Sequence, residues 1–241
     1  MIKEKGLRLK FIKQRVYEVL KEPLLNVGYK FNKELTAKKK LGNEFEVELN
    51  VVFTDYYPLQ YQMYFTGGMA QKRLLTPLKD LYEEMKKDIS VEGINNYLWN
   101  LTFVMGDFIP EVHEQRKALR HSNTFEFDSV DQFEEKLMAL KDMLISTVIP
   151  VMNILTDYDL LKTKIHDLVE LFRDEYYNIY SLLVFSFLYD RVNFENVYAQ
   201  VLLTTEAIKR DDNPVNDFFD HLPYVKKYLY EKYGKNDNLS Y

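Results

Sequence analysis

Residues 44–65 read EFEVELNVVFTDYYPLQYQMYF and contain the most regular pattern in the chain. From 45 to 53 every second residue is apolar, and the same alternation returns from 59 to 65. A period of two predicts strands that are buried on one face. Asp55 and Pro58, which separate the two runs, are residues that favour turns. The stretch therefore predicts a β-hairpin with one face in a core and one polar face.

The residues around this hairpin predict a helix before it and a mixed region after it. Apolar residues spaced three and four apart from Leu9 to Leu20 predict an amphipathic helix that ends between Pro23 and Gly28. We expect a strand at 28–35 and a charged turn at 38–43. Following the hairpin, TGG at 66–68 interrupts the strand pattern, and we expect a helix at 76–88 and short strands at 96–105 and 123–128.

From residue 129 onward the period changes from two to about 3.6. A helix is expected to begin at Ser129 with a capping box and to kink or end at Pro150. The segment 176–191 is apolar on all sides, which is typical of a buried helix, and we expect it to form a helical hairpin with the helix that begins at Asn193. A last helix is predicted at 222–234.

This order of elements predicts an α+β fold, because strands and helices are segregated along the chain and do not alternate. We expect an N-terminal helix and an antiparallel sheet in residues 1–128, followed by a helical part, residues 129–241, that contains the helical hairpin. No linker rich in Pro, Gly or Ser marks the boundary, so the two parts are expected to pack together as one unit.

Composition favours a cytoplasmic protein. The 241 residues include no cysteine, which excludes disulfides, thiolate metal sites and a cysteine nucleophile and is typical of a reducing compartment. The N-terminus has no continuous apolar segment typical of a signal peptide. The longest mostly apolar stretch, 143–155, is too short and too polar to span a bilayer, so we expect no membrane partner.

Motifs for catalysis, cofactors or metals are absent from the sequence. It has no glycine-rich phosphate loop and no serine elbow. The four histidines lack the spacing of a helical metal site. They are His113, His121, His166 and His221. We therefore expect no cofactor and no metal, and an enzyme is the less favoured interpretation. An active site assembled from distant residues remains an alternative.

Charge is distributed unevenly along the chain. The formal net charge is −5, yet residues 1–40 carry twelve lysines or arginines against four glutamates. A basic stripe is typical of proteins that contact phosphates. One alternative is therefore a nucleic-acid-binding protein that uses the N-terminal helix, with these contact residues: Arg8, Lys10, Lys13 and Arg15.

The order of elements resembles a group of uncharacterised bacterial α+β domains, some of which are immunity proteins encoded beside polymorphic or secreted toxins. The resemblance lies in LNVGYKF (25–31), in EFEVELNVVF with LQYQMYF, and in the capped helix, proline and second capped helix of 125–161. It extends over residues 8–205. It implies an interaction protein and assigns no catalytic residue.

These observations favour a non-enzymatic protein-binding protein, such as an immunity protein or inhibitor that binds a toxin or effector. Tyrosine is common at protein interfaces, and the chain has nineteen. Acidic residues on the polar face of the hairpin could match a basic cleft and speed association. The predicted contact residues are Glu44, Glu46, Glu48, Tyr56 and Tyr57. The sequence does not indicate an oligomeric state.

Overall fold

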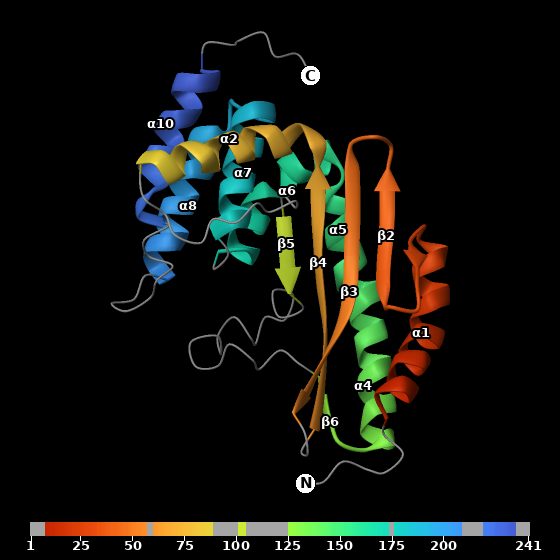
Figure 1. Cartoon of the computed structure of the whole chain (residues 1–241). Helices are drawn as coiled ribbons and strands as arrows, with labels where there is room; N and C mark the ends of the chain where they lie inside the picture. Colours follow the sequence, from red (N-terminus) through yellow and green to blue (C-terminus); the bar gives the residue numbers. More distant parts are fainter. Residues whose placement is uncertain are drawn as a thin grey trace. The chain divides into compact units, whose positions relative to one another are not determined.

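A computed structural model describes residues 8–56, 60–88, 101–104, 125–173, 176–208 and 219–234. It confirms the α+β fold: an N-terminal helix, an antiparallel sheet and then a helical part (Figure 1). The chain forms two compact units. The first comprises Met1–Met69 and Thr102–Thr156, and the second comprises Ala70–Leu101 and Asp157–Tyr241.

The sheet begins in the first unit and has the strand order β1-β2-β3-β4-β5, with β6 also paired to β4. The bounds of the strands are β1 Lys30–Phe31, β2 Thr36–Leu41, β3 Phe45–Tyr56, β4 Gln60–Gln71, β5 Leu101–Val104 and β6 Phe125–Phe127. The predicted hairpin is therefore β3–β4. Its apolar positions Val47, Leu49 and Val51 are at most 7% exposed, as the alternation predicts.

Helices α1 (Leu9–Asn26) and α4 (Val130–Met143) supply the other side of this core. In Figure 1, α4 and the shorter α5 (Ile149–Leu155) lie behind the strands. Phe133 of α4 is fully buried and lies 5.1 Å, between ring centroids, from Phe127 of β6. Because α4 and α5 belong to the sheet-containing unit, the two compact units differ from the division predicted at residue 128.

The helix that begins after Ser129 does not end at Pro150. Half of the predicted capping box is present, since Ser129 Oγ accepts a hydrogen bond from the backbone N–H of Gln132 at 3.4 Å. The side chain of Gln132 accepts from the backbone N–H of Asp128 at 3.1 Å, one residue before the N-cap. Helical backbone continues through a π-helix, η2 (Leu144–Val148), into α5, where Pro150 occupies the first turn. Proline lacks the N–H that an uninterrupted helix would require, and the π-turn changes the hydrogen-bonding pattern just before it. Pro150 is therefore accommodated within the helix.

By length and composition alone, Val130–Leu155 could cross a bilayer, whereas the sequence suggested no segment long enough. The core helix of a soluble protein passes the same test.

Two turns differ from the sequence-based expectation. The strand predicted at 28–35 is reduced to β1, and the lysines expected in a turn at 38–40 lie within β2. Leu35 adopts a φ of 66°, and the backbone N–H of Thr36 donates to Asn32 Oδ1 at 3.0 Å, so a tight turn separates β1 from β2. Leu35 is only 1% exposed, and its burial offsets the unfavourable backbone conformation.

The second unit is mainly helical. It contains α2 (Lys72–Asp88), α6 (Tyr158–Leu171), α7 (Tyr176–Tyr189), α8 (Phe194–Ile208) and α10 (Leu222–Tyr233). Helix α7 is buried from Asn178 to Phe187, as expected for a helix that is apolar on all sides. It forms the predicted helical hairpin with α8. Helix α2 begins at Lys72, directly after β4, so the interruption expected at 66–68 and a start at Thr76 are both wrong.

Candidate functional site

The polar face of β2 and β3 is a set of matched cross-strand pairs. The antiparallel register places Lys38 opposite Glu48 and Lys40 opposite Glu46. Lys38 Nζ lies 2.6 Å from Glu48 Oε2, and Lys40 Nζ lies 3.8 Å from Glu46 Oε2. The acidic residues predicted as a docking surface therefore lie beside lysines of the neighbouring strand. The local charge on this face is close to balanced.

Glu48 is held most firmly in this arrangement. Its carboxylate also accepts a hydrogen bond from Asn50 Nδ2 at 3.1 Å. Burial tends to raise the pKa of Glu48, but the hydrogen bonds from Lys38 and Asn50 and the charge of Lys38 outweigh this effect and lower the pKa below its usual value. The same hydrogen bond and the charge of Glu48 raise the pKa of Lys38.

The remaining predicted docking residues contribute less to a defined surface. Glu44 precedes β3 and is partly exposed. Tyr56 is the last residue of β3, and its side chain lies outside the described part of the structure, as does the whole of Tyr57. Of the predicted docking residues whose side chains the structure describes, Glu46 and Glu48 lie on one polar face, and both are paired with lysines.

The basic residues predicted along α1 are divided between two sides of the helix. At 3.6 residues per turn, Lys10 and Lys13 lie about 60° apart around the helix axis, whereas Arg15 lies about 160° from Lys13. Arg15 forms two hydrogen bonds with Glu134 of α4, from Nε at 2.8 Å and from Nη2 at 3.1 Å. The hydrogen bond and charge of Glu134 raise the pKa of Arg15. Arg8 is exposed at the N-cap.

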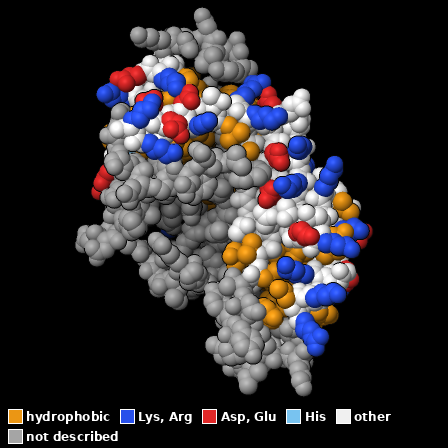
Figure 2. All heavy atoms as spheres, viewed as in Figure 1, with side chains coloured by type: hydrophobic (Ala, Val, Ile, Leu, Met, Phe, Trp, Pro, Cys, Tyr) orange, Lys and Arg blue, Asp and Glu red, His pale blue; other side chains and the backbone are white. Residues whose placement is uncertain are grey.

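Lys10, Lys13 and two further lysines form what we call the lysine strip: Lys10, Lys13, Lys21 and Lys33. On α1, Lys10, Gln14, Tyr17 and Lys21 follow the spacing that places residues on one side of a helix. Within the described ranges, none of the four lysines forms an ion pair with a carboxylate. In Figure 2, Lys and Arg side chains are prominent over the region of α1 and β2, with apolar side chains between them.

A hollow of about 380 Å³ opens within the lysine strip. Its lining residues are Leu9, Lys10, Lys13, Gln14, Tyr17 and Lys33. The Tyr17 ring is held in place, because it stacks on Phe31 with 5.5 Å between centroids, and Lys21 Nζ lies 5.4 Å from its centroid. Lys33 comes from the turn between β1 and β2, and no local sequence signal connected it with α1.

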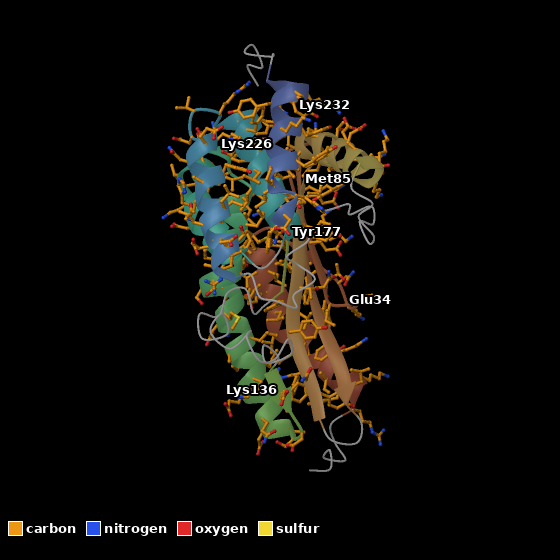
Figure 3. All side chains as sticks on the ribbon, turned by 90° about the vertical axis from the view of Figure 1, so that its left-hand side faces the viewer. Glu34, Met85, Lys136, Tyr177, Lys226 and Lys232 are labelled. Carbon is orange, nitrogen blue, oxygen red and sulfur yellow. The ribbon has the colours of Figure 1, made fainter. Side chains whose placement is uncertain are left out.

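The tyrosines of α10 are used largely for packing within the second unit. Figure 3 labels Lys226 and Lys232 on this helix. Lys226 Nζ and Tyr230 Oη each contact Glu195 of α8 at 2.6 Å. Lys232 Nζ donates to Asp80 of α2 at 2.7 Å. The cations and rings of α10 therefore largely contact one another and neighbouring helices.

The described ranges contain no cluster of side chains suited to a metal ion. No three His, Asp or Glu residues there are arranged to hold a metal ion. His166 hydrogen-bonds to Gln200, while Thr204 Oγ1 donates to Glu170 at 2.7 Å. These contacts join α6 to α8. His113 and His121 lie outside the described residues.

Comparison with known proteins adds no identity to this geometry: no family model matches the sequence, and neither a curated protein nor a solved structure is significantly similar to it.

Proposed function

We propose that this protein is a non-enzymatic binding protein that recognises an acidic protein partner through the lysine strip. The observation that carries the proposal is the contrast between paired and unpaired charge. Lys38, Lys40 and Arg15 each lie against a carboxylate, whereas the four strip lysines have no carboxylate partner in the described ranges. An acidic partner supplies the missing negative charge and is steered toward this side of the molecule.

A protein partner fits the lysine strip better than a nucleic acid does. Arg15 is paired with Glu134, so α1 has fewer basic residues available to contact phosphates. Four phosphate contacts correspond to a salt dependence with a slope of about −3.6 in log–log form, below the range of proteins that make six to ten contacts. Leu9 is 40% exposed beside the lysines, and Tyr17 and Gln14 lie between them. Mixed apolar, aromatic and cationic surfaces are typical of protein interfaces.

The resemblance to domains that include immunity proteins supports a toxin or effector as the partner, with binding in the cytoplasm. In this proposal the protein acts by covering a surface of its partner. The paired face of β2 and β3 is then a rigid support and does not attract the partner by charge. This differs from the expectation that Glu44, Glu46 and Glu48 dock into a basic cleft.

Charge reversal tests the proposal. The tagged protein and a variant with Lys10→Glu, Lys13→Glu and Lys33→Glu would be used to capture partners from lysate of the native host, and the affinity of the captured protein would then be measured. A control variant with the same change in charge carries Lys79→Glu, Lys136→Glu and Lys164→Glu. All six lysines are at least partly exposed, so the folds should be retained, which circular dichroism checks.

The proposal predicts one acidic protein that binds the wild type and the control but is lost from the strip variant. Its affinity should fall as salt increases from about 50 to about 200 mM. Capture of nucleic acid in its place, lost on the same charge reversal, would support the alternative and overturn the protein-binding proposal. Equal binding of the acidic protein to all three forms would show that the lysine strip is not the contact surface.

A further inference from the structure

The hollow in the lysine strip has the donors and the charge to hold a small anionic group. Lys10, Lys13 and Lys33 all line it, and each ammonium carries three hydrogen-bond donors and no acceptor. Gln14 adds an amide, one N–H of which already donates to Glu18 Oε1 at 2.7 Å. Because like charges in one hollow repel each other and no described carboxylate is paired with them, a bound anion would relieve a repulsion that the protein alone leaves in place.

The other wall of the hollow is apolar. Leu9 remains 40% exposed there, and Tyr17 presents part of an aromatic ring whose orientation is set by stacking on Phe31. A ligand that consists of a charged head alone would leave this wall in water. A ligand with an aromatic or aliphatic stem beside its charged head would cover Leu9 and contact Tyr17, and the burial of this apolar surface adds affinity.

We propose that the hollow binds a phosphate monoester carried on an aromatic or aliphatic stem. A phosphate monoester has a charge of about −1.5 to −2 at pH 7 and three terminal oxygens, so it matches three lysines better than a carboxylate with one negative charge. The inference rests on the proposed function only in that the same lysines take part. The phosphate could belong to a phosphorylated side chain of the protein partner or to a free phosphorylated small molecule.

Calorimetric titration with small probes tests the site without knowledge of the partner. Phenyl phosphate would be compared with inorganic phosphate, which lacks the stem, and with phenylacetate, which carries a carboxylate on a similar stem. We expect phenyl phosphate to bind at least about tenfold more tightly than either. Its advantage over inorganic phosphate is the burial of its ring against Leu9 and Tyr17, and its advantage over phenylacetate is on the scale of one charge-assisted hydrogen bond. Because the second ionisation of a phosphate monoester has a pKa of about 6, its affinity should fall between about pH 7 and about pH 5.

Two single substitutions locate the site. Lys13→Gln and Lys33→Gln should each weaken phenyl phosphate about tenfold. Lys136→Gln, on α4 (Figure 3), should leave the affinity unchanged. The inference is overturned if phenyl phosphate does not bind at millimolar concentration, if all three anions bind alike, or if the three variants behave alike.

A last pair of probes distinguishes the two sources of the phosphate. A tyrosine-phosphorylated acidic peptide that binds more tightly than phenyl phosphate would indicate a protein-borne group, and equal affinity would indicate a small molecule. The proposed function and this inference can fail separately. Phenyl phosphate binding without capture of an acidic protein would retain the site and overturn the function. Capture of an acidic protein that is lost from the strip variant, without phenyl phosphate binding, would do the reverse.

Discussion

Replacing Glu48 with Gln should destabilise the protein measurably, because this carboxylate is the most enclosed member of the cross-strand pairs. Its side chain is 21% exposed, that of Lys38 is 52% exposed, and their charged atoms lie 2.6 Å apart. Opposite charges that face each other across strands contribute about 0.2–1 kcal/mol. Because Glu48 also accepts a hydrogen bond from Asn50, its contribution should lie at the upper end of this range. We therefore expect Glu48→Gln to lower the free energy of unfolding by about 1 kcal/mol. For a chain of this size, that lowers Tm by roughly 2–4 °C.

A double-mutant cycle isolates the contribution of the pair. The free energy of unfolding would be measured by urea titration for the wild type, Glu48→Gln, Lys38→Met and the double variant. We expect a coupling energy of about 0.5–1 kcal/mol. The matched control is the pair Lys40–Glu46, whose charged atoms are 3.8 Å apart and whose side chains are 75% and 37% exposed. Its coupling should be close to zero.

The pH dependence of the coupling gives a second test with a fixed sign. The pKa of Glu48 is lowered in the folded state from its usual value of about 4.5. The contribution of the ionised carboxylate is therefore complete above about pH 4.5 and is lost as the pH falls through the folded-state pKa. Equal coupling energies for the two pairs, or a Lys38–Glu48 coupling that does not weaken as the pH falls below about 4.5, would refute the reasoning.

Two further pairs of substitutions test the core and one turn. In urea unfolding, Phe133→Ala should lower the free energy of unfolding by about 3–5 kcal/mol, because Phe133 is fully buried against Phe127. Phe11→Ala should cost clearly less, since Phe11 is 41% exposed. Equal costs for the two variants would contradict the assigned packing. Gly28 has a φ of 86°, and an added Cβ would lie 3.6 Å from Lys39 Cε, an ordinary contact. Gly28→Ala should therefore cost about 1–2 kcal/mol of stability through its backbone conformation alone. Gly28→Asn should cost less, because Asn tolerates a positive φ. If Gly28→Asn lowers Tm more than Gly28→Ala in thermal unfolding, the space for the side chain, and not the backbone, determines the cost.

The sequence predicted the elements that depend on local periodicity. The alternation in 45–53 identified β3 and its buried face, and the apolar run of 176–191 identified α7 as a buried helix. These patterns are readable because burial on one face or on all sides constrains every residue of an element. Boundaries were predicted less well. Lysines have low strand propensity, yet 38–40 lie within β2, because the whole of this strand pairs in antiparallel register with β3.

The difference between what local patterns predict and what depends on the fold is clearer at the candidate sites. The sequence by itself determined the α+β class, the two halves of the hairpin and the concentration of lysine in residues 1–40. Only the tertiary structure decided which charges are paired, because pairing depends on strand register and on contacts between distant segments. Arg15 and Glu134 are 119 residues apart, and Lys33 lines the hollow with Lys10 because the β1–β2 turn returns to α1. A charge in the sequence predicts exposure to solvent, but whether it is available to a partner is determined by the residues that folding brings within reach.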